Sequence, residues 1–408
     1  MEFKIEAKTF VQALEECAFI YKRTKRDDLK PIVTMETLVG EGTVLLKTYD
    51  PETGNGFNCY VQCEVAEHEK VSTRSDVLID WLNAGWDKRI GSSNRNKISL
   101  KSSLCGTVLH IKALNQDSEL ELFNLKSLEF ESIKVAPKPE ANFTIDSWAL
   151  NRSVNYILNC SHSDATFYFY RPNRKRTLQL VSVENGRTSV ASMYLLPQMK
   201  MQLQTPIVVT RGFLGALQVL FSQAHHETKI TFQPGEVIVH FNRNGYSSTF
   251  RMTSIHNREN DGIEKIKFNP DVKTIKIRCN DMGQLSNALD RLSAVIWTPL
   301  ENPTMIMKIK GVVLHMECLG IPNIAKELLP IERFVCNGGR VITVYLNHMK
   351  EAIQAIESLD IPSGRENDNQ GNLYIRGLTN GKEVLHISDA KDYYSSSQFH
   401  YESFLDIL

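Results

Sequence analysis

Residues 3–21 read FKIEAKTFVQALEECAFIY, a short alternating strand that leads directly into an amphipathic helix. Phe10, Leu14, Cys17 and Tyr21 recur three or four residues apart, which places them on one apolar helix face. Successive copies of this strand–helix unit begin about 64 to 73 residues apart, a period that indicates six internal repeats. The five later copies occupy residues 70–85, 142–159, 206–223, 274–297 and 340–359.

The sequence between the helices consists of short alternating runs such as TVLLKTYD and EVIVHFN. Gly, Asn, Asp and Pro punctuate these runs, a pattern typical of hairpins in antiparallel sheet. Linkers that contain proline, near residues 136–139 and 268–270, group the six units into three pairs. We therefore expect an α+β fold in which each domain packs two helices on antiparallel sheet. The predicted domains are 1–136, 140–268 and 271–408.

The composition is that of a soluble globular protein, with 408 residues, 42% hydrophobic and 23% charged. Apolar runs fall short of the roughly 18 residues that would span a bilayer. The N-terminus has no basic and apolar signal-peptide pattern, so we expect a cytoplasmic protein that contacts no membrane. Forty-seven basic and 47 acidic residues cancel, so the net charge neither favours nor excludes nucleic acid as a partner.

Catalytic motifs are missing from the sequence, which has no Gly-rich phosphate loop, HExxH or nucleophile elbow. The eight cysteines form no CxxC pair, and the neighbours His225 and His226 point in different directions along the chain. The pattern predicts neither an enzyme nor a metal or cofactor site. A nucleic-acid enzyme with an unrecognised site is the least favoured alternative.

Residues 180–193, LVSVENGRTSVASM, read as a hairpin with a tight turn at Asn185 and Gly186 and an arginine at its tip. Two interpretations stay open. Arg187 is either a fixed guanidinium that frames a binding surface, or a solvated side chain beside a glycine that merely permits the turn.

The chain resembles the bacterial DNA polymerase sliding clamp, or β clamp, over its whole length. The segments that carry the resemblance are FKIEAKTFVQALEECAFI, LKPIVTMETLV, SVNYILNCSHSDATFYF, VSVENGRTSVASM and RVITVYLNHMKEAIQAI, and the hairpin is the most specific. The resemblance implies that three clamp-type domains form half of a ring. A head-to-tail homodimer would encircle duplex DNA and tether a replicative polymerase without catalysis. The implied partners are double-stranded DNA, the polymerase, the clamp loader and other proteins with clamp-binding motifs.

Two segments depart from the family pattern. The chain has SIHNRENDGIEKI where the family carries an aromatic-proline segment, and it ends SFLDIL in place of a Met/Pro-containing tail. These departures indicate a divergent member and affect the shape of the partner pocket more than the fold. The alternative function is an accessory or mobile-element paralogue that keeps the clamp fold and assembles with partners without being loaded on DNA.

The resemblance also implies three sets of site residues. A pocket for partner peptides would use Phe169, Val183, Asn185, Arg187, Thr188, Phe404, Leu405 and Leu408. Weak, sequence-independent phosphate contacts would come from Arg23, Lys25, Arg26, Arg152, His162, Arg211 and Arg291. The ring would close between Leu120 and Leu122 on an edge strand and Val295 and Ile296 after the fifth helix, unless these four are ordinary core residues.

Overall fold

The fold comes from a computed structural model of the chain, which contains the strand–helix unit six times. The described residues are 2–18, 32–50, 53–84, 97–102, 108–113, 119–123, 125, 133–172, 176–195, 199–221, 226–243, 245–253, 275–279, 282–294, 303–319, 324–334, 340–358, 371–389 and 399–408.

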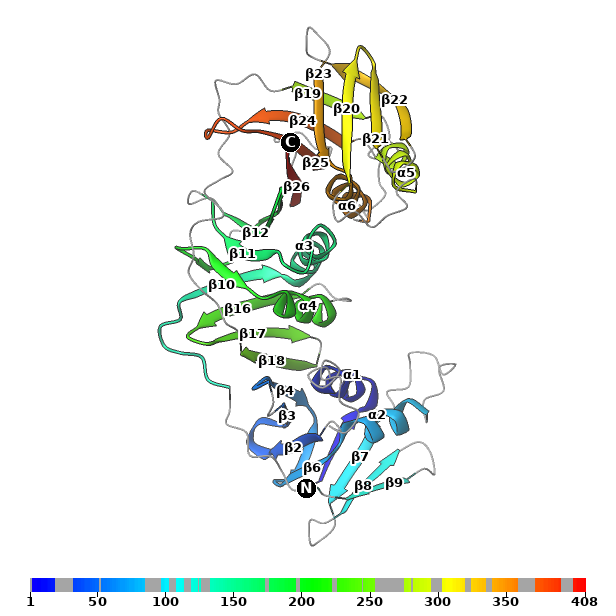
Figure 1. The fold of residues 1–408 in the computed structure, drawn as a ribbon. Helices are drawn as coiled ribbons and strands as arrows, with labels where there is room; N and C mark the ends of the chain where they lie inside the picture. The colour runs from blue at the N-terminus through cyan, green and yellow to red at the C-terminus, as the bar shows by residue number, and fades with distance from the viewer. Residues whose placement is uncertain are drawn as a thin grey trace. The chain divides into compact units, whose positions relative to one another are not determined.

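Each predicted unit is present as a strand with a helix next along the chain, which confirms the repeat (Figure 1). The pairs are β1 (Glu2–Glu6) with α1 (Ala7–Ala18), β6 (Lys70–Arg74) with α2 (Ser75–Ala84), β10 (Ala141–Asp146) with α3 (Ser147–Asn159), β15 (Ile207–Val209) with α4 (Arg211–Leu220), β19 (Ile275–Cys279) with α5 (Met282–Ser293), and β23 (Arg340–Tyr345) with α6 (Leu346–Glu357).

The apolar periodicity determines which face of α1 is buried. Phe10, Leu14 and Cys17 are fully buried, as the spacing predicts, and the Phe10 ring meets the Phe3 ring edge-on at 6.1 Å. Tyr21, the fourth residue of the predicted face, lies outside the described residues.

All the strand pairings are antiparallel within the described residues, and they build three sheets. The five-stranded sheet has the order β5 (Glu64–Glu67), β1, β7 (Lys97–Ser102), β8 (Val108–Ala113), β9 (Glu119–Phe123). The nine-stranded sheet has the order β14 (Met201–Gln202), β10, β16 (Glu227–Gln233), β17 (Glu236–Arg243), β18 (Tyr246–Thr253), β4 (Gly56–Gln62), β3 (Thr43–Tyr49), β2 (Ile32–Leu38), β6. The twelve-stranded sheet has the order β15, β11 (Thr166–Tyr170), β12 (Thr177–Glu184), β13 (Arg187–Tyr194), β26 (Phe399–Asp406), β25 (Glu383–Asp389), β24 (Gly371–Gly377), β19, β22 (Ile324–Phe334), β21 (Val313–Leu319), β20 (Thr304–Lys310), β23.

The chain divides into two compact units. The first comprises Met1–Asp146, Lys200–Gln202 and His225–Ile255, with the five- and nine-stranded sheets and helices α1 and α2. The second comprises Ser147–Met199, Leu203–Ala224 and His256–Leu408, with the twelve-stranded sheet and helices α3 to α6. The predicted middle domain contributes residues to both units, and the division into three domains stays a prediction.

Helices pack in neighbouring pairs, with α1 on α2 in the first unit, and α3 on α4 and α5 on α6 in the second (Figure 1). In the second unit α3 also packs on β12, β13 and β26, so one face of this sheet is covered by helix. We call it the helix face and the opposite side the outer face. In the parts of the chain that the structure describes, every helix is too short or too polar to serve as a membrane span.

Candidate functional site

The predicted hairpin is present, and a two-residue turn joins its strands. Glu184 at the end of β12 pairs with Arg187 at the start of β13, leaving Asn185 and Gly186 as the connection. Gly186 has a φ of +80°, a conformation that glycine adopts without strain. A Cβ atom at this position would also lie 3.2 Å from the Tyr345 ring, so both the backbone conformation and the packing favour glycine here.

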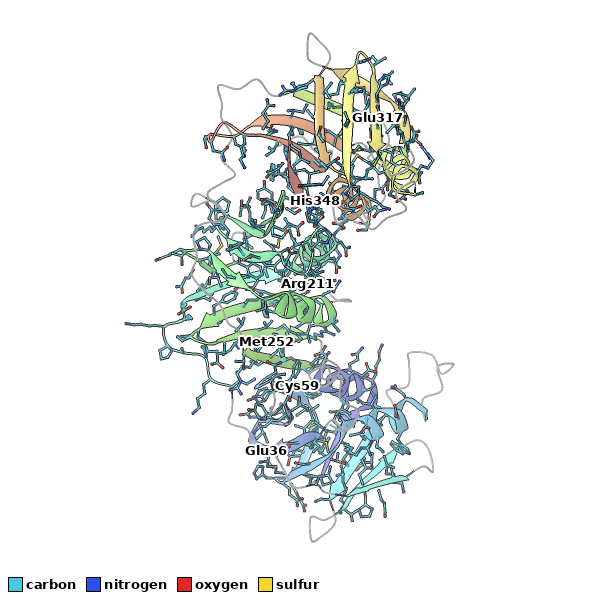
Figure 2. All side chains as sticks on the ribbon, viewed as in Figure 1. Glu36, Cys59, Arg211, Met252, Glu317 and His348 are labelled. Atoms are coloured by element: carbon cyan, nitrogen blue, oxygen red, sulfur yellow. The ribbon has the colours of Figure 1, made fainter. Side chains whose placement is uncertain are left out.

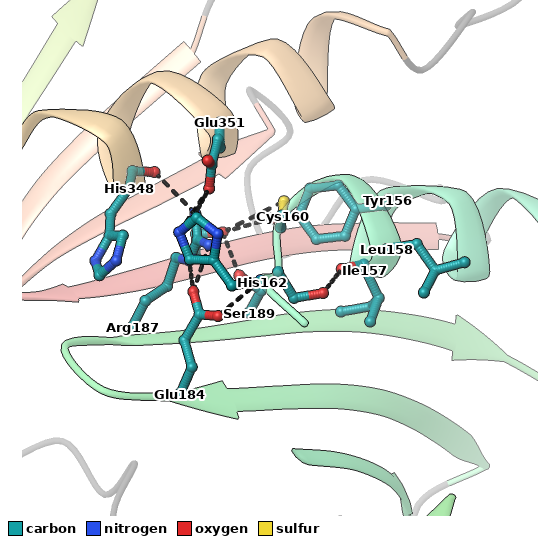
Figure 3. A network of polar contacts seen from close by, with 12 residues as sticks. Tyr156, Ile157, Leu158, Cys160, His162, Glu184, Arg187, Ser189, His348 and Glu351 are labelled. Carbon is teal, nitrogen blue, oxygen red and sulfur yellow. Dashed lines mark hydrogen bonds and ion pairs between the residues drawn. The ribbon is translucent and has the colours of Figure 1, made fainter. Parts of the chain in front are cut away.

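Arg187 is buried, with only 1% of its side chain exposed. Its guanidinium pairs with Glu184 across the turn, and with Glu351 on α6 at 2.7 Å (Figure 3). It also donates a hydrogen bond to the carbonyl oxygen of His348 at 3.3 Å. The interpretation of Arg187 as a solvated side chain is therefore wrong, because its polar partners belong to this chain and join the hairpin turn to α6.

Strand alternation sends the predicted pocket residues to opposite sides of the sheet. On the helix face lie Phe169, which is fully buried, together with Arg187 and its pairing partner Leu405 on β26. The same face carries a buried hydroxyl chain, in which Ser403 lies 2.9 Å from both the Tyr156 hydroxyl and the Ser189 hydroxyl. This polar chain fixes α3 against β13 and β26.

The outer face holds three more of the predicted residues, namely Val183, Thr188 and Phe404. Thr188 pairs with Phe404, and Val183 lies against a cluster that contains the Phe404 ring. We call this the outer-face cluster, and its buried members are Tyr168, Val181, Val190, Leu378, Val384 and Phe404, with Tyr170, Val183 and Val208 half-buried at its margin. The register thus brings hairpin and C-terminal residues together on one apolar surface.

Tyr168 and Tyr170 are cluster residues that our sequence interpretation missed, since it chose Phe169 from the same strand. A shift of one residue moves a side chain to the opposite face of a sheet. The alternation of Thr166, Tyr168 and Tyr170 places these side chains on one face of the strand, but the sequence does not say which face of the sheet the helices cover.

Of the remaining predicted pocket residues, Asn185 is exposed at the turn. Leu408 is 54% exposed, and its backbone N–H donates a hydrogen bond to the Thr343 carbonyl at 2.9 Å.

Next to the outer-face cluster, three aromatic rings stack in the order Tyr374, His386, Phe404, and the last two have centroids 4.5 Å apart. His386 Nε2 lies 2.8 Å from the buried carboxylate of Glu402, which His400 also approaches at 3.2 Å. Burial lowers the pKa of His386. Burial would raise the pKa of Glu402, but the hydrogen bonds and charges of His386 and His400 outweigh it and hold that pKa well below its usual range.

These two shifts act in the same direction on stability. Below pH about 6.5 an unfolded His386 binds protons that the folded one does not, and below about 4.5 the same holds for Glu402. We expect the free energy of unfolding to fall as the pH falls from 6.5, and more steeply below 4.5, by up to about 1.4 kcal/mol per pH unit for each proton. Urea denaturation at pH 7, 5.5 and 4 measures this dependence.

Glu402→Gln should flatten the part of this dependence below pH 4.5, because the variant has no carboxylate to protonate there. Asp164→Asn, which changes an exposed carboxyl on the loop after α3, serves as the control. An identical acid profile for Glu402→Gln and wild type would assign the dependence to other groups.

The predicted phosphate-binding residues have varied surroundings. Arg211, at the start of α4, donates hydrogen bonds to the carbonyls of Leu158, Ser161 and His162, at the end of α3 and the loop after it, at 2.9 to 3.2 Å. Arg291 forms a two-pronged pair with Glu327 at 2.7 and 3.0 Å. The guanidinium of Arg152 lies 4.6 Å from the centre of the Trp148 ring, and His162 is exposed. Arg23, Lys25 and Arg26 lie outside the described residues.

Two of the four predicted ring-closure residues can be placed. Leu120 and Leu122 lie on β9, half-buried, and β9 is the terminal strand of its sheet as far as the described residues go. A terminal strand has free backbone groups along one side, as an interface strand requires. Val295 and Ile296 lie outside the described residues.

Comparison with solved structures identifies the architecture. Over its full length the chain superposes on the DNA polymerase sliding clamp of Pseudomonas aeruginosa bound to griselimycin, with a TM-score of 0.73, 16% identity and 99% of that chain covered. The chain has the sliding-clamp fold. The Helicobacter pylori beta clamp in complex with carprofen gives a TM-score of 0.72 at 14% identity, with all of both chains covered. A putative DNA polymerase III beta subunit from Eubacterium rectale gives 0.70 at 12% identity, with 100% of this chain and 99% of that chain covered.

Comparison of sequences does not detect this similarity. No protein-family profile matches the chain, and no curated protein matches it. The α+β prediction and the resemblance to the clamp fold are confirmed by the three-dimensional structure, and at 12 to 16% identity this similarity establishes the fold alone.

Proposed function

We propose that this protein is a DNA sliding clamp that holds a replicative polymerase on duplex DNA without catalysing a reaction. The observation that supports this most strongly is the full-length correspondence with DNA polymerase III beta subunits, which includes all six strand–helix units. In this proposal two chains pair head to tail in a closed ring, and the clamp loader opens the ring in the cytoplasm. Ring closure uses Leu120 and Leu122 of one chain against Val295 and Ile296 of the other.

DNA contacts in the proposed ring are electrostatic and independent of sequence. Arg23, Lys25 and Arg26 are the main candidates, because consecutive basic side chains on one segment can follow a phosphate backbone. Arg152 and His162 supplement them. Arg211 and Arg291 are exposed, but their hydrogen bonds within the chain favour a weaker contribution to phosphate contact.

A retention assay on nicked circular DNA tests the function. Loaded protein should remain on the circle and be lost when the circle is linearised, since a ring slides off a free end. A triple variant with alanine in place of Arg23, Lys25 and Arg26 should be retained more weakly, and equally so on different DNA sequences. The salt dependence of its retention should also be smaller. Protein that is never retained, yet binds polymerase, would favour the alternative of a paralogue that is not loaded on DNA.

The outer-face cluster is the proposed docking surface for partner peptides. Its half-buried margin of Tyr170, Val183 and Val208 offers apolar area for one or two anchor side chains, and Thr188 offers a polar edge. This moves the expected contact from Phe169 and Leu405, which face the helices, to Val183 and Phe404. Arg187 acts by fixing the turn beside the cluster.

Val183→Asp should weaken binding of a peptide from the host's own polymerase by at least about tenfold, because a carboxylate at the cluster margin must be desolvated when an apolar anchor binds. Fluorescence titration of a labelled peptide gives the dissociation constants. The control is Val312→Asp, a valine that is 64% exposed on the β20–β21 turn. Equal affinities for the wild type and both variants would place the docking surface elsewhere.

A further inference from the structure

Three side chains that are distant in the sequence converge beside the Arg187 network. His162 comes from the loop after α3, Glu184 from the end of β12, and His348 from the first turn of α6. One nitrogen or oxygen atom of each lies within 4.8 Å of the corresponding atoms of the other two. Figure 3 shows the two imidazoles and the Glu184 carboxylate around the turn.

The His348 side chain is buried within this cluster (Figure 2). The residue is 3% exposed, and its Nδ1 is buried with no hydrogen-bond partner among the described residues.

The charged groups beside the cluster are two carboxylates and one guanidinium. Two carboxylates, Glu184 and Glu351, share the single guanidinium of Arg187. Glu351 also approaches His162 Nε2 at 3.7 Å, so a second carboxylate borders the cluster. The Glu184 side chain is only 4% exposed and His348 is buried, whereas the His162 side chain is 46% exposed. The cluster is thus buried at Glu184 and His348 and open to solvent at His162.

We propose that His162, Glu184 and His348 form a binding site for a divalent transition-metal ion of the zinc class. Two imidazole nitrogens and one carboxylate oxygen suit zinc, while magnesium and calcium prefer oxygen ligands. Metal–ligand bonds of about 2.0–2.2 Å require these atoms to approach one another by about 1 Å. Rotation of the His162 side chain, which is 46% exposed, allows this movement. A bound ion would join the hairpin turn, α6 and the loop after α3.

This inference departs from the expectation of no metal site. Sequence patterns detect ligands at short spacings, whereas these three residues come together through the pairing of β13 with β26 and the packing of α3 on α6. The proposal is independent of clamp function, since its readout is metal binding by the purified chain.

Zinc binding by tag-free, chelator-treated full-length protein tests the site, with a chromophoric chelator as competitor. We expect one Zn²⁺ per chain, and at least about tenfold weaker binding for His162→Ala, since the loss of a ligand should cost no less than the loss of a supporting contact. His315→Ala, which removes a half-buried imidazole from β21, should bind as wild type does. Mg²⁺ at the same concentration should not displace the Zn²⁺.

A second variant and a spectroscopic probe distinguish loss of a metal ligand from loss of folding. His162 is exposed, so His162→Ala should fold normally, and near-UV circular dichroism checks this. Co²⁺ added to wild type should give visible absorption bands of imidazole coordination, which His348→Gln should abolish. Wild type that binds no Zn²⁺, or variants that bind it as tightly as wild type, would overturn the proposal.

Discussion

Arg187→Ala should lower the free energy of unfolding by about 3–5 kcal/mol, because it leaves a buried carboxylate without its cation. Glu184 is 4% exposed and pairs with this guanidinium, which also reaches Glu351 and the His348 carbonyl on α6. Loss of these two contacts would remove the polar connection between the hairpin turn and α6. Urea denaturation monitored by circular dichroism at pH 7 measures the change.

Two further variants distinguish a buried ion pair from general loss of packing. Arg291→Ala removes another arginine–glutamate pair, but the side chain of that arginine is 58% exposed, so the variant should keep nearly all of the wild-type stability. Adding Glu184→Gln to Arg187→Met should restore much of the stability, since no uncompensated charge remains buried. If Arg187→Ala unfolds at the same urea concentration as wild type, the network contributes no net stability.

Leu120→Asp combined with Ile296→Asp should convert the proposed dimer into a folded monomer and abolish retention on nicked circular DNA. Carboxylates within a small apolar seam must lose their hydration on association, and this cost opposes closure at both junctions of a two-chain ring. Because Leu120 is a half-buried residue of a terminal strand, we expect the fold to persist. Sedimentation velocity reports the oligomeric state, and circular dichroism reports the fold.

Leu328→Asp is the matched control, since it adds the same charge at a leucine that is 62% exposed on β22. It should sediment and load as wild type does. A dimer that survives the double substitution would show that the seam has been misplaced, and a wild-type monomer would remove the basis of the ring proposal.

The sequence by itself determined the repeat and the type of each element. A period of 3.6 on each helix and of 2 on each strand is a local property, and the apolar side chains that produce it must be buried on one face wherever the element packs. Phe10, Leu14 and Cys17 show this, since all three are fully buried on α1. The turn at Asn185 and Gly186 was equally local, because its backbone conformation selects those residue types.

Only the tertiary structure decided which face of each strand meets helix and which meets solvent. The alternation in Thr166–Tyr170 is the same whichever face is covered, so Tyr168 and Phe169 could not be assigned until α3 was seen to pack on β12 and β13. The environment of Arg187 depends on α6, which is more than 150 residues away, as the 161-residue separation from His348 illustrates. Such contacts arise because long-range strand pairing, here β13 with β26, brings together side chains whose spacing in the sequence carries no periodic signal.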